Sequence, residues 1–417
     1  MFVSELLGAT LRDARGRVVG RLGDVVARVD GGEPAPVAGL LVRRGYGRGH
    51  GDVFLPVAAV TELAPRAATP RVDPATLAPF ARRPHEVLLG RDVMDSQVIS
   101  LREPRVVRVN DVALTRDGDS WRATGVGVGI GALARRLLPR GLRRSDAGRG
   151  PIIPWAEIEL LSSEVPGGLV PPDHRRLARL HPADIARIAD AVPRRQATEI
   201  VASLDDELAA DTMEEMLDAK QADVIEELEP ERAADILDRM APDAAADVLA
   251  ELEPEVVDTV LRRMDPAEAG DVHALLTYPH NTAGGLMSTD YVMAPRGLRV
   301  DEALDHLRPQ MAKPDLVYYV YVVEDERDRQ LRGVFSLRDL LLAGGARRVD
   351  DIMVTDVRGV APDTPAPVVA RTMSEYNLMA LPVTDADGRM LGVVSVDDAL
   401  EIILPAELRR RIPRIFS

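Results

Sequence analysis

The sequence predicts a multidomain α+β protein: small β-barrels at the N-terminus, a central α-helical superhelix and a C-terminal pair of α/β modules. Three observations predict this order. Short valine-rich runs bounded by glycine and aspartate fill residues 1–163. Two segments after residue 286 copy each other in the order strand, helix, strand, strand, helix. Between them, prolines recur with a spacing of 12 at positions 230, 242, 254 and 266.

Length and composition allow several ordinary globular domains. A chain of 417 residues with 46% hydrophobic residues is too long for one core and suits three domains. The start, MFVSELLGATLRDARG, lacks a basic region followed by an apolar one, so no secretory signal is expected. Charges or prolines interrupt every apolar run before the roughly 20 residues of a membrane span. With no cysteine, disulfides and thiolate zinc sites are excluded, and we expect a cytoplasmic protein.

Charge is distributed unevenly along the chain. Residues 1–163 contain 24 arginines and 18 acidic residues, whereas the remainder contains 28 basic and 49 acidic residues. An acidic surface of this size repels nucleic acid and anionic lipid and attracts cations. We therefore expect no nucleic-acid partner.

The front of the chain is predicted as two related halves, residues 1–63 and 86–163, joined by a Pro/Ala linker at 64–85. Both halves share a Leu-Leu-Gly start, an Asp-Val turn and a Pro-x-x-x-Val/Ile close, which favours small antiparallel barrels. They resemble PRC-barrel domains. The resemblance implies an assembly module that binds a protein partner, whose identity the sequence does not give.

The second half carries a basic insert. Residues 133–144 combine arginines with leucines and are compatible with a basic amphipathic helix. Three interpretations stay open: a peripheral membrane contact, a contact with an acidic partner or with the chain's own acidic repeats, and a solvated loop. The glycines just before it lack the strand, helix and downstream acid of a dinucleotide loop.

Residues 173–277 are predicted as a superhelix of short helices. Units of about 12 residues begin near Pro182, Pro193, Asp205 and Asp218 and continue at the four regularly spaced prolines. Proline and acidic residues suit the first turn of a helix, where the N–H groups are unpaired and the helix dipole is positive. Each unit is too short to be stable alone, so the units should stack through their Leu, Ile and Met faces. Most of the acids are then expected on a solvated face.

The stretch TYPHNTAGGLMSTDYV, residues 277–292, follows the repeats and is predicted as a neutral, bendable hinge because of its adjacent glycines. The copied modules follow at residues 286–345 and 350–405. They resemble CBS domains, which commonly form homodimers. Ser336 and Ser395 begin Ser-x-x-Asp helices, and the resemblance implies an adenosine site there; simple helix capping is the alternative.

The segments HPADIA, YPHNTAGGLM and YYVYVV through GVFSLRDLLLA together resemble the cytosolic part of the MgtE magnesium channel family, over about residues 173–404. The resemblance implies that Mg2+ bridges acids of the helical domain and the second CBS module, which closes the two together. The implied metal ligands are Asp211, Asp243, Asp247, Asp398 and Glu401. The implied ATP-binding residues are Tyr319, Ser336, Arg338 and Asp339.

Other positions depart from the family pattern. Pro367, Asn377, Ala406, Arg409 and Arg410 occupy places where acids are usual, and residues 406–417 form a basic tail. No membrane domain follows, so transport by this polypeptide alone is not expected.

We therefore expect a soluble Mg2+-responsive regulatory protein, with ATP or another adenine nucleotide as a further ligand. The alternatives are an interaction scaffold of CBS and PRC-barrel modules without metal sensing, and an adenine-nucleotide sensor. No nucleophile, zinc or phosphate-loop motif points to an enzyme.

Overall fold

The computed structural model describes residues 1–13, 15–29, 34–43, 52–65, 67–72, 76–118, 120–129, 151–161, 174–312 and 317–403. Of residues 174, 175, 312 and 401–403, the backbone alone is described. The predicted basic insert at 133–144 and the basic tail at 406–417 lie outside these residues. The chain divides into two compact units, Met1–Leu204 and Asp205–Ser417. No helix in the described parts is long and apolar enough to cross a membrane.

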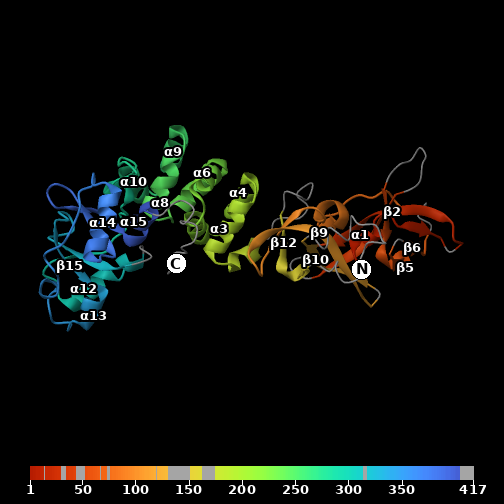
Figure 1. Cartoon of the computed structure of the whole chain (residues 1–417), viewed down its shortest axis with the longest axis horizontal. Coiled ribbons are helices and arrows are strands. Elements are labelled where there is room, and N and C mark those ends of the chain that lie inside the picture. The colour runs from red at the N-terminus through yellow and green to blue at the C-terminus, as the bar shows by residue number, and fades with distance from the viewer. Residues whose placement is uncertain are drawn as a thin grey trace. The chain divides into compact units, whose positions relative to one another are not determined.

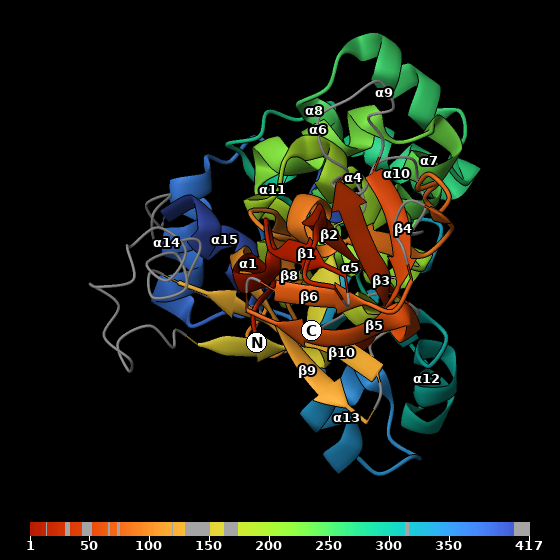
Figure 2. The same ribbon diagram turned by 90° about the vertical axis from the view of Figure 1, so that its right-hand side faces the viewer.

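The first unit contains one hydrogen-bonded network of twelve strands (Figure 1). Its main path runs β12-β8-β9-β10-β3-β2-β1-β6-β5, with β11 on β10, β4 on β3 and β7 on β2. Figure 2 shows β2, β3 and β4 side by side. The strands are β1 (Thr10–Arg12), β2 (Val18–Arg28), β3 (Ala35–Arg43), β4 (Asp52–Pro56), β5 (Val60–Ala64), β6 (Ala67–Pro70), β7 (Glu86–Leu88), β8 (Gln97–Ser100), β9 (Arg105–Asp117), β10 (Ser120–Val128), β11 (Ile152–Pro154) and β12 (Ile158–Leu160).

The two halves of this sheet exchange their starting segments. At the start of the first half, the short helix α1 (Val3–Leu6) lies on the second half, where Asp111 accepts the Ser4 N–H at 3.1 Å and the Ser4 hydroxyl at 2.5 Å. Conversely, β7 at the start of the second half pairs with β2 of the first, and Asp24 accepts the Gly90 N–H at 2.7 Å. Asp24 and Asp111 therefore each hold the start of the other half, but they lie within β2 and β9 next to shifts in strand register, so the prediction of Asp-Val turns is wrong.

One hydrophobic core spans both halves, from Val3 to Ile158. The sheet is continuous because Ala35 and Pro36 of β3 pair with Ala123 and Arg122 of β10. The prediction of a β-rich N-terminal region is confirmed, while the closure of either half into a barrel stays a prediction. The segment predicted as a linker contains strand β6, which pairs with β1 and β5.

Short helices follow at each position that the repeat predicts, coloured yellow-green to green in Figure 1. In the first unit these are α3 (Pro182–Ala191) and α4 (Arg194–Ala202), which pack together. In the second unit they are α5 (Asp206–Glu214), α6 (Asp218–Glu227), α7 (Pro230–Leu237), α8 (Pro242–Ala250), α9 (Pro254–Leu261) and α10 (Pro266–Leu275). Helices α3, α7, α8, α9 and α10 have proline as their first residue.

Within the second unit, each helix packs against the next but one: α5 on α7 and α7 on α9, and α6 on α8 and α8 on α10. Two carboxylates link helices further apart. Glu214 at the end of α5 accepts the Ala241 N–H, at the start of α8, at 2.7 Å, and Asp238 after α7 accepts the Asp265 N–H, at the start of α10, at 3.0 Å. These acids cap unpaired helix N–H groups and are not merely solvated.

The first C-terminal module has the predicted order of strand, helix, two strands and helix, whereas the second has no leading strand among the described residues, so the prediction is wrong at that point. The first contains β13 (Met293–Pro295), α12 (Val300–Leu307), β14 (Tyr319–Val323), β15 (Leu331–Ser336) and α13 (Leu337–Leu342). The second contains α14 (Ala366–Tyr376), β16 (Ala380–Thr384), β17 (Met390–Ser395) and α15 (Val396–Ile403). Strand β13 is parallel to β14, whereas β14–β15 and β16–β17 are antiparallel hairpins.

The modules also exchange segments. Ser288, near the start of the first module, forms a bridge with Val393 in β17 of the second, and Val354 of the second module forms one with Val334 in β15 of the first. A Cβ atom on Gly333 would lie 2.6 Å from Met353 Sδ, and one on Gly392 would lie 2.7 Å from Met287 Cγ. The two glycines are therefore needed so that the exchanged segments can approach closely.

The prediction of a free hinge at residues 277–292 is wrong for its second half. Backbone N–H groups of Ala283 and Gly284, in the short helix α11 (Ala283–Leu286), donate to the carbonyls of Thr364 and Pro362 at 2.8 Å. A Cβ atom on Gly284 would lie 2.6 Å from the Tyr278 ring. These glycines permit close packing on the second module, and the segment is docked.

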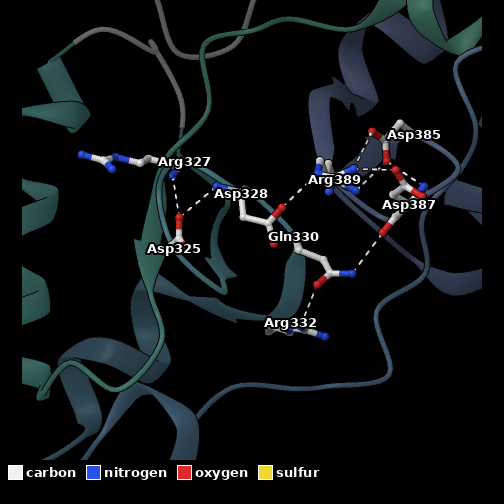
Figure 3. Close-up of polar contacts among 8 residues, drawn as sticks. All are labelled: Asp325, Arg327, Asp328, Gln330, Arg332, Asp385, Asp387 and Arg389. Atoms are coloured by element: carbon white, nitrogen blue, oxygen red, sulfur yellow. Dashed lines mark hydrogen bonds and ion pairs between the residues drawn. The ribbon is translucent and has the colours of Figure 1, made fainter.

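The hairpin turns of the two modules form a polar clasp (Figure 3). Arg389 Nε donates to Asp328 at 2.9 Å, and Gln330 Nε2 donates to the Asp387 carbonyl at 3.1 Å. The backbone adds a bond from the Leu331 N–H to the Gly388 carbonyl at 3.0 Å. The clasp therefore joins the two CBS modules at the ends of their hairpins.

Candidate cation-binding cleft

A cleft of about 210 Å³ lies between the repeat helices and the CBS modules of the second unit. Its acidic lining residues are Asp211, Glu214, Asp243, Asp290, Asp397 and Asp398. Its other lining residues are Arg239, Met240, Ala241, Ser288, Tyr291, Val292, Val317, Tyr318, Tyr319, Tyr321, Ala380, Val393 and Ser395. Six carboxylates face one arginine, so the cleft carries a strong negative potential that attracts cations.

Short elements position the acids of the helical side. Asp211 and Glu214 lie in the last turns of α5, and Asp243 is the second residue of α8. The bond from the Ala241 N–H to Glu214 fixes the start of α8 relative to α5. Asp243 is thereby held near Asp211 and Glu214 although it lies in a different repeat.

The electrostatic environment of Asp243 is strongly perturbed. Burial, together with the neighbouring charges of Asp398 and Glu214, raises the pKa of Asp243 to about 7, against a smaller lowering by a hydrogen bond with Ser288. Its Oδ1 atom is buried and has no hydrogen-bond partner among the described residues. A buried carboxylate oxygen without a donor is costly unless a cation or a proton satisfies it.

Asp398 on the CBS side has a second role. Its Oδ2 accepts the Ser395 hydroxyl at 2.6 Å and the Ser395 N–H at 3.2 Å, which forms a capping box at the start of α15. This capping fixes the orientation of the Asp398 side chain toward the cleft that both residues line.

The donor set suits a hard cation such as Mg2+, which prefers carboxylate oxygens. The orphaned Asp243 Oδ1 is a fitting ligand atom. Among the described side chains, however, no group of three or more His, Asp or Glu residues is close enough to hold a metal ion directly. An ion in this cleft would therefore retain water between itself and most of the carboxylates, as Mg2+ does in sites with one or two carboxylate ligands.

The remaining predicted metal ligands lie differently. Asp247 does not line the cleft; its Oδ1 lies 3.0 Å from His280 Nδ1, and this hydrogen bond raises the pKa of His280. The side chain of Glu401 lies outside the described residues. The predicted set is thus brought together only in part, with Asp211, Asp243 and Asp398 in one cleft.

The predicted nucleotide residues lie near one another, at the end of the β14–β15 hairpin and the start of α13. Ser336 and Asp339 form the capping box of α13, with the Ser336 hydroxyl donating to Asp339 Oδ2 at 2.7 Å, and these bonds lower the pKa of Asp339. Tyr319 is opposite Ser336 in the β14–β15 ladder but lines the acidic cleft. Arg338 is exposed. Capping, the alternative considered from the sequence, is present at both Ser-x-x-Asp helices.

Residue-level reasoning missed several cleft residues. Glu214 precedes the start of α8 by 27 positions, and this spacing recurs between Asp238 and Asp265, so a search for acids repeated at that interval could have found it. Asp290 and Tyr291 belong to the stretch interpreted as a hinge, and Tyr318 and Tyr321 lie just before and within β14, where no local signal marks them as lining a cleft.

Comparisons with known proteins agree with this architecture. Residues 180–281 match the MgtE intracellular N domain, and residues 283–345 and 349–405 match the CBS domain. The magnesium transporters MgtE of Thermus thermophilus and Enterococcus faecalis are 44% identical over 133 residues and 38% identical over 136 residues. These matches cover 32% and 33% of this chain, and 29% and 30% of the relatives, so the chain spans less than a third of their length.

Two solved structures cover a larger share. The crystal structure of the soluble part of a magnesium transporter aligns with a TM-score of 0.51 and 31% identity, over 55% of this chain and 90% of that one. The cytosolic domain of the Mg2+ channel MgtE in complex with ATP aligns with a TM-score of 0.52 and 35% identity, over 55% of this chain and 95% of that one.

Proposed function

Because residues 180–405 are homologous to the cytosolic region of the MgtE magnesium transporters, we propose that this protein is a Mg2+-responsive regulatory protein. In this proposal, cations entering the acidic cleft draw the repeat helices α5–α10 onto the CBS modules. The single observation that supports it most is the convergence of six carboxylates on one cleft, with a buried Asp243 oxygen that has no donor among the described residues.

The energetic basis is the mutual repulsion of these carboxylates. Two like charges about 4 Å apart repel by roughly 1–4 kcal/mol at effective dielectric constants of 80 to 20. Bound Mg2+ supplies the positive charge that cancels this repulsion. Asp211, Asp243 and Asp398 would hold it through their oxygens and its retained waters, with Asp247 and Glu401 as further proposed ligands after a closing movement.

The pivot for such a movement would lie between α10 and Asn281. The Asn281 carbonyl accepts the Ala366 N–H at 2.9 Å, and the N–H groups of Ala283 and Gly284 bond to the second CBS module. We therefore place the bend in the connection between Leu275 and Asn281, where the contact of His280 with Asp247 would have to break or to move with the helices. This restricts the proposed hinge to a few residues.

Small-angle X-ray scattering of the full chain across a Mg2+ titration tests the proposal. We expect a decrease in the radius of gyration that NaCl at matched ionic strength does not reproduce, and that is reduced in Asp243→Asn and Asp398→Asn. Asp258→Asn, at an exposed position of α9 outside the cleft, is the matched control. A titration in which all four proteins respond alike, or only to salt, would contradict the metal-sensing proposal and favour the scaffold interpretation.

A second proposal is that an adenine nucleotide binds the CBS modules. It is favoured by the ATP complex of the related cytosolic domain, and by the Ser336 and Asp339 pair at the start of α13. Asp339→Ala is expected to reduce ATP binding measured by calorimetry, with Asp258→Ala as control. Undiminished binding to Asp339→Ala would rule out this choice of residues.

The cellular setting is proposed from the same homology. We propose a cytoplasmic protein that forms a homodimer through its CBS modules and contacts a protein partner through the two PRC-barrel-like halves, residues 1–63 and 86–163. Peripheral membrane contact through residues 133–144 is retained as a proposal that rests on the sequence alone. Sedimentation of the full chain, with and without vesicles of anionic lipid, tests the dimer and the membrane contact together.

A further inference from the structure

The acidic cleft has a second chemical character that Mg2+ does not explain. Four of the protein's seven tyrosines line it: Tyr291, Tyr318, Tyr319 and Tyr321. Aromatic residues make up only 3% of the sequence, so their concentration here is a local feature. Hydrated Mg2+ is bound by oxygen ligands and has no use for aromatic faces.

Three of these tyrosines, Tyr291, Tyr319 and Tyr321, belong to one small hydrophobic cluster that borders the cleft. The rings of Tyr291 and Tyr321 meet edge to face with centroids 6.1 Å apart, and Tyr319 and Val393 pack against the same small core as Tyr321. Tyr318 and Tyr319 are half-buried, so part of each side chain is accessible. A cleft lined by both aromatic rings and carboxylates suits an organic cation, whose charge interacts with carboxylates and ring faces and whose carbon atoms cover apolar surface.

Two polar atoms show which kind of organic cation fits. Tyr321 is only 2% exposed, and its hydroxyl has no hydrogen-bond partner in the described part of the chain; the same is true of the buried Asp243 Oδ1. A buried hydroxyl and a buried carboxylate oxygen without partners are both satisfied by N–H donors. A quaternary ammonium group, which has no N–H, would leave them unsatisfied.

We propose that this cleft binds a small alkylamine cation carrying N–H donors, with the ammonium group against Asp243 and the Tyr321 hydroxyl and the alkyl chain on Tyr318 and Tyr319. The inference shares the location of the proposed Mg2+ site but rests on the tyrosines, not on the metal. A volume of about 210 Å³ suits a ligand of a few carbon atoms. The amine and Mg2+ would compete for the same carboxylates. Occupancy of the cleft by either cation would therefore depend on the concentrations of both.

Isothermal titration calorimetry of the full chain with putrescine, at constant ionic strength and without Mg2+, tests the proposal. Tetramethylammonium and the uncharged 1,4-butanediol are the comparison ligands. We expect putrescine to bind more tightly than tetramethylammonium and butanediol not to bind. No putrescine binding, or equal binding of all three ligands, would overturn the inference.

Substitutions in the cleft distinguish putrescine binding from the Mg2+ response. Tyr318→Leu and Tyr319→Leu should weaken putrescine about fivefold and leave the Mg2+ response unchanged, whereas Asp243→Asn should weaken both. Tyr321→Phe preserves the ring and should weaken putrescine but not tetramethylammonium. Tyr376→Leu, at an exposed tyrosine outside the cleft, is the control. Putrescine binding that survives both leucine variants overturns the inference, and loss of the Mg2+ response alone contradicts only the proposed function.

Discussion

Carboxylates in this protein differ by environment far more than by sequence context. Asp24 is 1% exposed and accepts the N–H groups of Gly90 and Val25 through Oδ1, while its Oδ2 has no hydrogen-bond partner among the described residues. Burial raises the pKa of Asp24 although these hydrogen bonds oppose the rise. Asp258, by contrast, is exposed on a repeat helix. The same residue type is thus a structural linker in one place and a solvated charge in another.

Two substitutions of Asp24 should distinguish the effect of its charge on stability from the effect of its hydrogen bonds. Because the folded pKa is raised, the folded state holds the proton more tightly, so the wild-type first unit should gain stability relative to Asp24→Asn as the pH falls from neutral toward about 4. Asp24→Ala leaves buried N–H groups without an acceptor and should cost about 1–3 kcal/mol. Urea unfolding followed by tryptophan fluorescence measures this, since both tryptophans, Trp121 and Trp155, lie in this unit. Equal pH dependence in wild type, Asp24→Asn and the exposed control Asp117→Asn would contradict it.

The raised pKa of Asp243 makes proposed Mg2+ binding pH-dependent. A group with a pKa of about 7 is mostly protonated at pH 6 and mostly charged at pH 8, and the proton competes with the metal. The Mg2+ concentration at the midpoint of compaction should therefore rise about tenfold from pH 8 to pH 6. Scattering titrations at the two pH values measure the shift, and Asp243→Asn should abolish most of it. An unchanged midpoint in the wild type would show that Asp243 does not take part.

Single residues of the cleft were predictable only through the family resemblance. Asp211, Asp243 and Asp398 lie in one cleft as that resemblance implies, yet nothing in their local sequence distinguishes them from solvated neighbours. Asp247 matches the same repeat position as other acids but faces His280, because the docked segment brings that histidine close. Burial and contacts with residues distant in sequence decide whether an acidic side chain lines the cleft, and the local sequence predicts neither.

At the scale of elements, the local sequence was sufficient to predict where the repeat helices begin. It was not sufficient to predict whether the adjacent glycines are flexible or closely packed. Proline marks the first turn of a helix by its own geometry, so the beginnings of α7 to α10 followed directly from the spacing. The adjacent glycines Gly284 and Gly285 suggested flexibility, but they are close-packed against Tyr278, Pro279 and the distant Pro362. The N-terminal halves were likewise predicted as separate barrels. Their sheet is continuous through the pairing of β3 with β10, and the local sequence could not show this because the paired residues are far apart in the chain.

The close approach at Gly333 and Gly392 leads to a stability prediction. Alanine at either position would bring a Cβ within 3 Å of a methionine of the exchanged segment, and at Gly392 also within 2.7 Å of the Ser288 carbonyl. Such overpacking should cost about 1–3 kcal/mol in thermal or urea unfolding followed by circular dichroism. Gly344→Ala is the matched control, because nothing lies within 4 Å of its Cβ, and it should be neutral or slightly stabilising. Equal stability of all three variants would show that the exchanged segments do not pack as described.

At the scale of the whole molecule, the division into two units offers a way to locate cation binding. Tryptophan fluorescence reports on Met1–Leu204 alone, while circular dichroism is dominated by the helices of Asp205–Ser417. Mg2+ at about 100 times its dissociation constant should raise the dichroism midpoint by roughly 5–10 °C and leave the fluorescence midpoint unchanged. Matched NaCl is the control. An equal shift of both transitions would contradict the placement of the cation cleft in the second unit.

The exchanged starts of the N-terminal sheet also bear on how the protein is made. Met1 donates from its amino terminus to the carbonyl of Leu114, and Ser4 depends on Asp111. As the polypeptide leaves the ribosome, residues 1–6 therefore lack these partners until the chain has been translated as far as Leu114 in the second half. Translation speed and early contact with chaperones should thus influence the yield of this region more than they would for a domain that closes on its own first hairpin.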